Sequence, residues 1–198
     1  MKTLPDLARL RLPVAIALPL VLALPPLRGL LEASMSLHML VQVPLLALAG
    51  WLLAAALPAR WRARTEAWNA YGITGLVASA LAMMLLMIPR LLDLVLVDWR
   101  FEAAKWLVLL ACGAGLQLSW RRAGLVVQGF FLGNMLPMTA MAGQLYQDAP
   151  LRLCNAYLLD DQVWLGQALV AIAVSIGIAW IAQLFVHMVR KEAGTLPV

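Results

Sequence analysis

The sequence contains few charged residues. Of its 198 residues only 13% are Asp, Glu, Lys or Arg, whereas 64% are hydrophobic. A soluble domain is typically about 25% charged and about 45–50% apolar. This chain has too little polar surface to cover a globule in water, so the composition predicts an integral membrane protein. Its positive charges stand in short clusters between long apolar runs, which is typical of membrane topology and excludes a nucleic-acid partner.

Cysteine and histidine are also scarce. Cys112 lies in an apolar run, Cys154 lies in a polar loop, and no CxxC pair exists, which argues against a cysteine metal site or a disulfide framework. The two histidines, His38 and His187, are predicted on opposite sides of the membrane. They cannot complete a Ser-His-Asp triad or a paired haem ligation, so we do not expect an enzyme. No ionisable group other than cysteine lies in the middle of an apolar run, which makes transport a weaker hypothesis.

The long apolar runs predict an all-α protein, a polytopic transmembrane helix bundle that forms a single domain over residues 1–198. A spanning helix needs about 20 mostly apolar residues. Six segments are candidates, and the first is short and rich in proline: residues 12–27, 37–57, 70–88, 103–120, 124–143 and 163–189. The N-terminus lacks an A-x-A cleavage site, so we interpret the first segment as an uncleaved span.

The loop charges predict the orientation. With the N-terminus in the cytoplasm, that side collects ten basic residues, namely Lys2, Arg9, Arg11, Arg60, Arg62, Arg64, Arg121, Arg122, Arg190 and Lys191. The other side keeps five, namely Arg28, Arg90, Arg100, Lys105 and Arg152. This positive-inside bias predicts that both termini are cytoplasmic and that His38 lies at the outer, periplasmic end of the second helix.

A possible metal site begins at His38. Met35, His38, Met39 and Gln42 are spaced i, i+3, i+4 and i+7, so one helix face is expected to carry all four. Thioether and imidazole groups suit Cu(I). Further methionines fall in the outer halves of the third and fifth helices: Met84, Met87, Met138 and Met141. Methionine also fills gaps in helical cores, and a histidine at a helix end is often an interfacial polar residue, so a structural interpretation stays open.

Three ordered segments carry a family resemblance. They are "HMLVQVPLLALAGW", "IPRLLDLVLVDWRFEAAKWLVLLACGAGLQLSW" and "DDQVWLGQALV". In this order and spacing the chain resembles the CtaG family of membrane-bound cytochrome c oxidase assembly factors. The resemblance implies a factor of the bacterial inner membrane that helps to stage or insert copper into a respiratory haem–copper oxidase. Its partners would be membrane lipid and the oxidase or its copper chaperones. The eight residues above would hold Cu(I), and Asp161 and Gln162 would shape the outer rim.

The chain departs from that family at three positions. Gln42, Phe101 and Lys105 stand where the family has histidines, and a cationic lysine repels a nearby metal ion. We expect Lys105 to pair with Glu102, three residues earlier on the same helix face. The departures support an alternative hypothesis, in which the chain is a metal-free structural subunit or scaffold of a membrane respiratory or redox complex.

Overall fold

The structure, a computed structural model, describes residues 4–193 and is built from helices alone over that range. The predicted all-helical fold is therefore confirmed. In chain order the elements are α1 (Leu4–Leu22), α2 (Pro25–Glu32), α3 (Met35–Leu37), the π-helical turn η1 (His38–Gln42), α4 (Val43–Ala56), α5 (Ala59–Glu66), α6 (Ile73–Leu86), α7 (Pro89–Val97), α8 (Trp99–Ser119), α9 (Gly124–Asp148) and α10 (Leu159–Ala193).

Several helices are long and apolar enough to cross a membrane. Four segments have the required length and hydropathy without a break: Met35–Ala56, Trp99–Ser119, Gly124–Asp148 and Leu159–Lys191. Two helix pairs reach the same length only together and are sharply bent, Leu10–Leu22 with Pro25–Glu32 by 72° and Ile73–Leu86 with Pro89–Val97 by 75°. The described chain thus has four candidate spans, or six if each bent pair counts as one.

Prolines explain both bends. A residue before proline is driven out of the helical region, and Leu24 and Ile88 both have extended backbone, with ψ of 128° and 122°. Proline suits the first turn of a helix, so α2 and α7 begin directly after these residues. The predicted segment 12–27 crosses the first bend and ends inside α2, whereas the predicted segment 70–88 ends at the second bend, after which the chain continues as α7.

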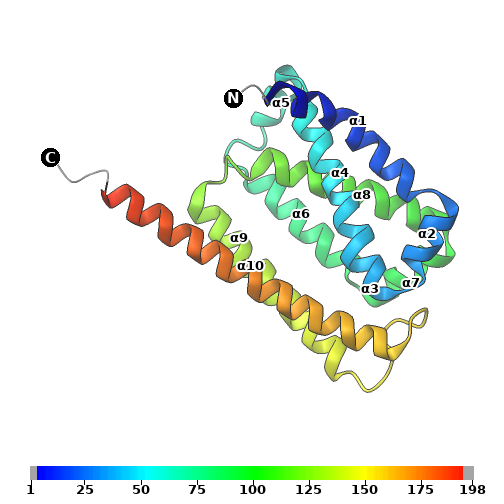
Figure 1. The fold of residues 1–198 in the computed structure, drawn as a ribbon. Coiled ribbons are helices and arrows are strands. Elements are labelled where there is room, and N and C mark those ends of the chain that lie inside the picture. Colours follow the sequence, from blue (N-terminus) through cyan, green and yellow to red (C-terminus); the bar gives the residue numbers. More distant parts are fainter. Residues whose placement is uncertain (1–3, 194–198) are drawn as a thin grey trace.

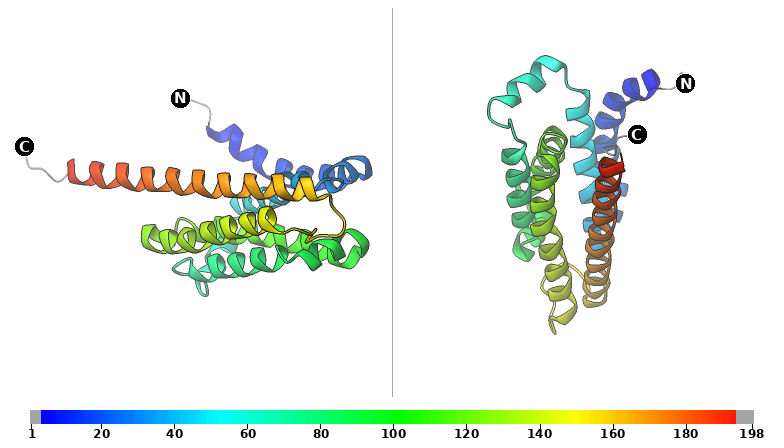
Figure 2. Two further views of the ribbon diagram at one scale, coloured as in Figure 1. Left: turned by 90° about the horizontal axis from the view of Figure 1, so that it is seen from below. Right: turned by 90° about the vertical axis from the view of Figure 1, so that its left-hand side faces the viewer.

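The helices form two groups (Figure 1). α4 and α8 pack side by side, α1 lies against α4, and α6 lies against α8. α9 and α10 form an antiparallel hairpin beside this group. α2, α7 and the 149–158 connection lie at one end of the bundle, while the start of α1 and the C-terminal end of α10 lie toward the other end (Figure 2).

Glycine permits the closest helix contact. A Cβ atom placed on Gly113 of α8 would lie 1.7 Å from the carbonyl oxygen of Ala47 on α4, and one on Gly50 would lie 2.0 Å from the carbonyl oxygen of Leu110. Small residues let helix backbones approach in this way inside membranes. The Gly50 and Gly113 contact therefore sets the distance between α4, which continues directly from η1, and α8, the helix that carries Lys105.

The π-helical turn has a local cause. Pro44 comes two residues after the turn, lacks an N–H group, and has a ring that clashes with the carbonyl four residues earlier in a regular helix. The chain widens here, and the Val43 N–H donates to the carbonyl of His38, five residues back. Such wide turns often occur at functional sites, and this one contains both His38 and Gln42.

Candidate functional site

Lys105 is the centre of a buried polar cluster. Its side chain is only 2% exposed although it carries an ammonium group. The Nζ atom lies 2.9 Å from Gln42 Oε1, 3.1 Å from His38 Nε2 and 3.2 Å from Glu32 Oε1. An ammonium group has three N–H donors and no acceptor, so these three contacts satisfy it completely. The contacts join α2, η1 and α8.

His38 is fully buried and uses both ring nitrogens. Because an ammonium group only donates, Nε2 accepts from Lys105 and the ring proton is on Nδ1. Nδ1 lies 2.6 Å from the hydroxyl oxygen of Tyr157 and donates to it. Tyr157 comes from the connection between α9 and α10, and burial, followed by the charge of Glu32, raises the pKa of its phenol, which stays protonated at neutral pH. In this arrangement neither imidazole nitrogen is open to a metal ion.

Glu32 balances the charge of Lys105. Its Oε1 also accepts from Gln42 Nε2 at 3.2 Å, and its Oε2 accepts from Arg28 Nε at 3.0 Å. Arg28 Nη2 in turn lies 2.7 Å from Glu102 Oε2. The cluster therefore contains two cations and two carboxylates, and its formal charges cancel. The expected pair of Lys105 with Glu102 is wrong, because Arg28 takes Glu102 and the closer carboxylate for Lys105 comes from α2.

Asp161 holds the start of α10 against α3. Its carboxylate accepts from the hydroxyl and backbone N–H groups at the N-terminus of α3, with contacts to Ser34 Oγ at 3.0 Å, to the Met35 N–H and to Ser36 Oγ. The first N–H groups of a helix have no partner inside it, and an acidic side chain satisfies them and suits the helix dipole. Asp161 thereby fixes the helix turn that leads into His38.

Gln162 and Asp93 hold the connection that carries Tyr157. Gln162 is buried, accepts from the Leu153 N–H at 2.8 Å and donates to the Tyr146 carbonyl at 3.1 Å. Asp93 of α7 accepts from the backbone of Asn155 at 3.1 Å. Sequence reasoning placed Asp161 and Gln162 at the rim of a copper site, and the structure gives both of them partners that position the cluster.

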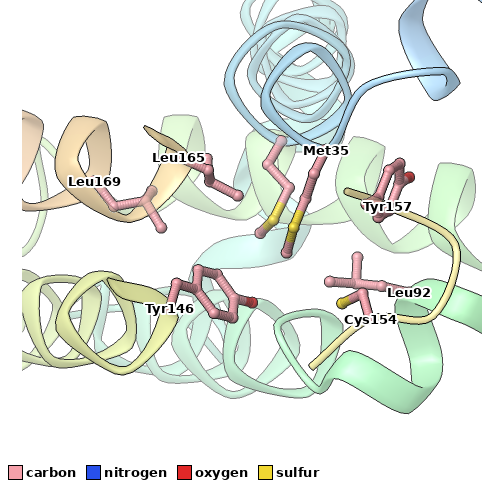
Figure 3. Packing of buried hydrophobic residues seen from close by; sticks show 8 residues of the cluster. Met35, Leu92, Tyr146, Cys154, Tyr157, Leu165 and Leu169 are labelled. Carbon is pink, nitrogen blue, oxygen red and sulfur yellow. The ribbon is translucent and has the colours of Figure 1, made fainter. Parts of the chain in front are cut away.

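The methionines beside His38 belong to an apolar core instead. Met35 and Met39 are buried with Leu92, Tyr146 and Leu165, and Met87 packs against the same cluster. Figure 3 shows the Met35 side chain among Leu165, Tyr146 and Leu92. The four residues that were predicted to share one helix face therefore divide into two pairs with different surroundings. His38 and Gln42 contact Lys105, whereas Met35 and Met39 pack into the core cluster that includes residues of α9 and α10.

The other predicted copper ligands lie elsewhere. Met84 and Met138 line a groove between α6 and α9, where each is about two-fifths exposed. Met141 is 71% exposed on the outer surface of α9. A different cavity, of about 320 Å³, is lined by His38 and Lys105 together with Met39, Met83 and Met87. The structure thus brings only part of the predicted set near the histidine.

The donor set does not fit a copper ion in this geometry. Nε2 of His38 accepts from the Lys105 ammonium, and Nδ1 donates to the Tyr157 hydroxyl. Most of the predicted thioether ligands lie away from the His38 ring. Within residues 4–193, no three side chains of His, Cys, Asp or Glu are grouped as metal ligands would be. The Cu(I) site therefore stays a prediction.

Sequence reasoning missed three members of the cluster, Arg28, Glu32 and Tyr157, and gave Lys105 the wrong partner. One signal was present, since Glu32 and Lys105 are opposite charges at the ends of separate apolar segments. A second signal was the suggested family resemblance, which sets Gln42 and Lys105 at positions of histidines, and in the structure Lys105 contacts both His38 and Gln42. Phe101, the third such position, has a partly exposed side chain.

Comparisons with protein-family models, with curated proteins and with solved structures found no match for this chain. The likeness to the CtaG family therefore rests on the three sequence segments alone. The function is therefore inferred from the geometry of the buried cluster.

Proposed function

We propose that this chain is a multi-pass protein of the bacterial inner membrane that acts, without a metal of its own, as an assembly factor or scaffold for a membrane-bound respiratory complex. One observation carries the proposal. The Lys105 ammonium, with all three donors satisfied, sits against His38 and Gln42, where the resemblance implies metal-binding histidines. The ammonium supplies the positive charge that a metal ion would bring to the same helices.

A charge-balanced cluster suits a structural role. Buried ion pairs add little net stability compared with apolar packing. They restrict the helices that carry them to one arrangement, because a buried charge without its partner is costly. Here the pair of Lys105 with Glu32 fixes α8 against α2, and His38 with Tyr157 fixes the connection before α10. A rigid outer end, presented next to a membrane partner such as an oxidase or its copper chaperones, is what a scaffold needs.

A second candidate, the staging of Cu(I) for a haem–copper oxidase, is favoured by the cavity beside the cluster. Met39, Met83 and Met87 line it together with His38, and thioether and imidazole groups are soft donors that suit Cu(I). This function requires that the hydrogen bond between Lys105 Nζ and His38 Nε2 break before His38 Nε2 binds Cu(I).

An anaerobic Cu(I) titration of the purified protein separates the two candidates. We expect no stoichiometric binding by the native chain, and the same result for His38→Ala and for Met35→Ala/Met39→Ala. A Gln42→His/Lys105→His variant should gain metal binding, because it places three imidazoles in contact and removes the cation. Tight binding by the native chain that is lost in His38→Ala would refute the metal-free proposal.

The deletion phenotype provides the cellular test. Without a scaffold, we expect less assembled respiratory complex, while each complex that remains keeps its normal copper content. Loss of a copper-staging factor leaves the complex present but depleted of copper. Normal amounts of every respiratory complex in the deletion strain, each with its normal copper content, contradict both candidates.

A further inference from the structure

Asn134 is a polar residue exposed on the outside of α9. Its Nδ2 donates to the Phe130 carbonyl at 2.7 Å, and in residues 4–193 no hydrogen-bond partner is found for its amide oxygen or its second N–H. Asn134 is the eleventh of the 25 residues of α9, about 15 Å along a helix that rises about 1.5 Å per residue. With a hydrocarbon core about 30 Å thick, a spanning α9 places this amide near the middle of the bilayer.

An exposed amide at that depth needs a partner from outside the chain. Lipid tails offer neither donors nor acceptors, and an unsatisfied polar group in hydrocarbon costs several kcal/mol. Inside membranes, asparagine side chains instead form hydrogen bonds between neighbouring helices. The free acceptor and donor of Asn134 therefore point to a second helix that packs against α9 and carries a hydrogen-bonding group at the same depth.

The surface around Asn134 has room for such a helix. Asn134 lines a groove of about 630 Å³ between α6 and α9, and the rest of its lining is apolar, including Val77, Leu81, Phe130 and Met138. A Cβ atom placed on the neighbouring Gly133 would meet no atom within 4 Å, so the α9 backbone can be approached closely there. Val126 and Phe130, which line the groove, and Met141, further along α9, are all more than two-thirds exposed, so an apolar face of α9 is open to a neighbouring helix.

We propose that α9 is the contact surface between two copies of this chain, with Asn134 of one copy hydrogen-bonded to Asn134 of the other. A carboxamide carries both a donor and an acceptor, so two of them satisfy each other. A two-fold axis along the membrane normal places the same residue of both copies at one depth, and two-fold dimers are the commonest symmetric assemblies. This inference is independent of the buried cluster and of the proposed function.

The test uses the full chain in lipid vesicles of low protein density, with the stoichiometry counted by single-molecule photobleaching. We expect dimers for the native chain. Asn134→Leu should weaken dimerisation by about 3-fold to 30-fold, the range for hydrogen bonds between membrane helices. Thr139→Val is the matched control, because Thr139 lies on the same helix but donates to its own backbone at Met135, and its dimerisation should match that of the native chain.

Cysteine cross-linking provides a second measurement that does not depend on the folding of Asn134→Leu. Met141→Cys should cross-link to a second copy through a short bifunctional reagent, whereas Leu107→Cys on α8, which is 69% exposed, should not. The two native cysteines are both buried and serve as the background. The proposal is overturned by a monomeric native chain, by equal effects of Asn134→Leu and Thr139→Val, or by cross-linking of Met141→Cys to a different protein.

Discussion

Replacing Lys105 by methionine tests whether the ammonium holds the cluster together. Methionine keeps a similar length and removes the charge. The substitution takes a donor away from Glu32, His38 and Gln42 at once, and all three side chains are buried or nearly so. Breaking a buried ion pair by removing one partner typically costs about 3–5 kcal/mol.

Arg28 places the expected loss at the lower end of that range. Its Nε lies 3.0 Å from Glu32 in the native chain, and the substitution removes neither partner of this pair, so we expect the carboxylate to keep one cation. We therefore expect Lys105→Met to lower the free energy of unfolding by about 3 kcal/mol. Glu32→Gln in the same chain removes the remaining uncompensated charge, and the double variant should recover to within about 1 kcal/mol of the native chain.

The assay is reversible unfolding in a mild detergent, followed for the native chain, the two single variants and the double variant. Arg122→Met is the control, because Arg122 pairs at 2.8 Å with Glu66, whose side chain is 61% exposed, and such surface pairs contribute at most about 1 kcal/mol. If Lys105→Met costs no more than Arg122→Met, or if the double variant is as unstable as the sum of its parts, the cluster is not a coupled ion pair and the reasoning fails.

Three further predictions concern other parts of the fold. Asp161→Asn should lower stability by about 1–2 kcal/mol in thermal unfolding, since an amide nitrogen cannot accept from the N-terminus of α3, whereas the exposed neighbour Asp160→Asn should have no effect. Gly113→Val should prevent folding, judged by loss of a monodisperse peak in gel filtration, because a Cβ atom there meets a backbone carbonyl of α4, while Gly29→Ala, with open space around it, should behave normally. Burial, followed by a nearby carboxylate, raises the pKa of the Cys154 thiol to about 11, so at pH 8 only about one thiol in a thousand is ionised. With the other cysteine changed to serine, iodoacetamide should label the native protein at pH 8 far more slowly than the denatured protein; equal rates contradict the buried position of Cys154.

The sequence predicted the helices well because apolar runs and prolines act locally. The run that follows Pro44 was long enough to define a helix, and the prolines marked where helices end. The bends were missed, since Pro25 and Pro89 each end one helix and also suit the first turn of the next. Whether the chain continues at 72° or 75° or enters a loop depends on what the new helix packs against, which no local pattern contains.

The candidate site was predicted only in part for the same reason. His38 and Gln42 are four residues apart on one helix, and the local rule for helix neighbours brings them together correctly. The same rule paired Lys105 with Glu102, and it failed because Glu32, which is 73 residues away in the chain, lies within 3.2 Å. An ion pair between distant segments follows from tertiary packing.

That separation of 73 residues has a consequence for how the protein is made. Glu32 is synthesised long before Lys105. Its carboxylate therefore lacks the lysine partner until α8 has been synthesised and packs against the earlier helices. Lys105 is the seventh of the 21 residues of α8, and burying its ammonium group without a partner is unfavourable, so a carboxylate that is already in place lowers the cost of packing this helix. A nascent chain that stops before α8 holds the pair of Arg28 with Glu32 but has neither Lys105 nor Glu102, so the four charges of the cluster come together only when α8 is complete.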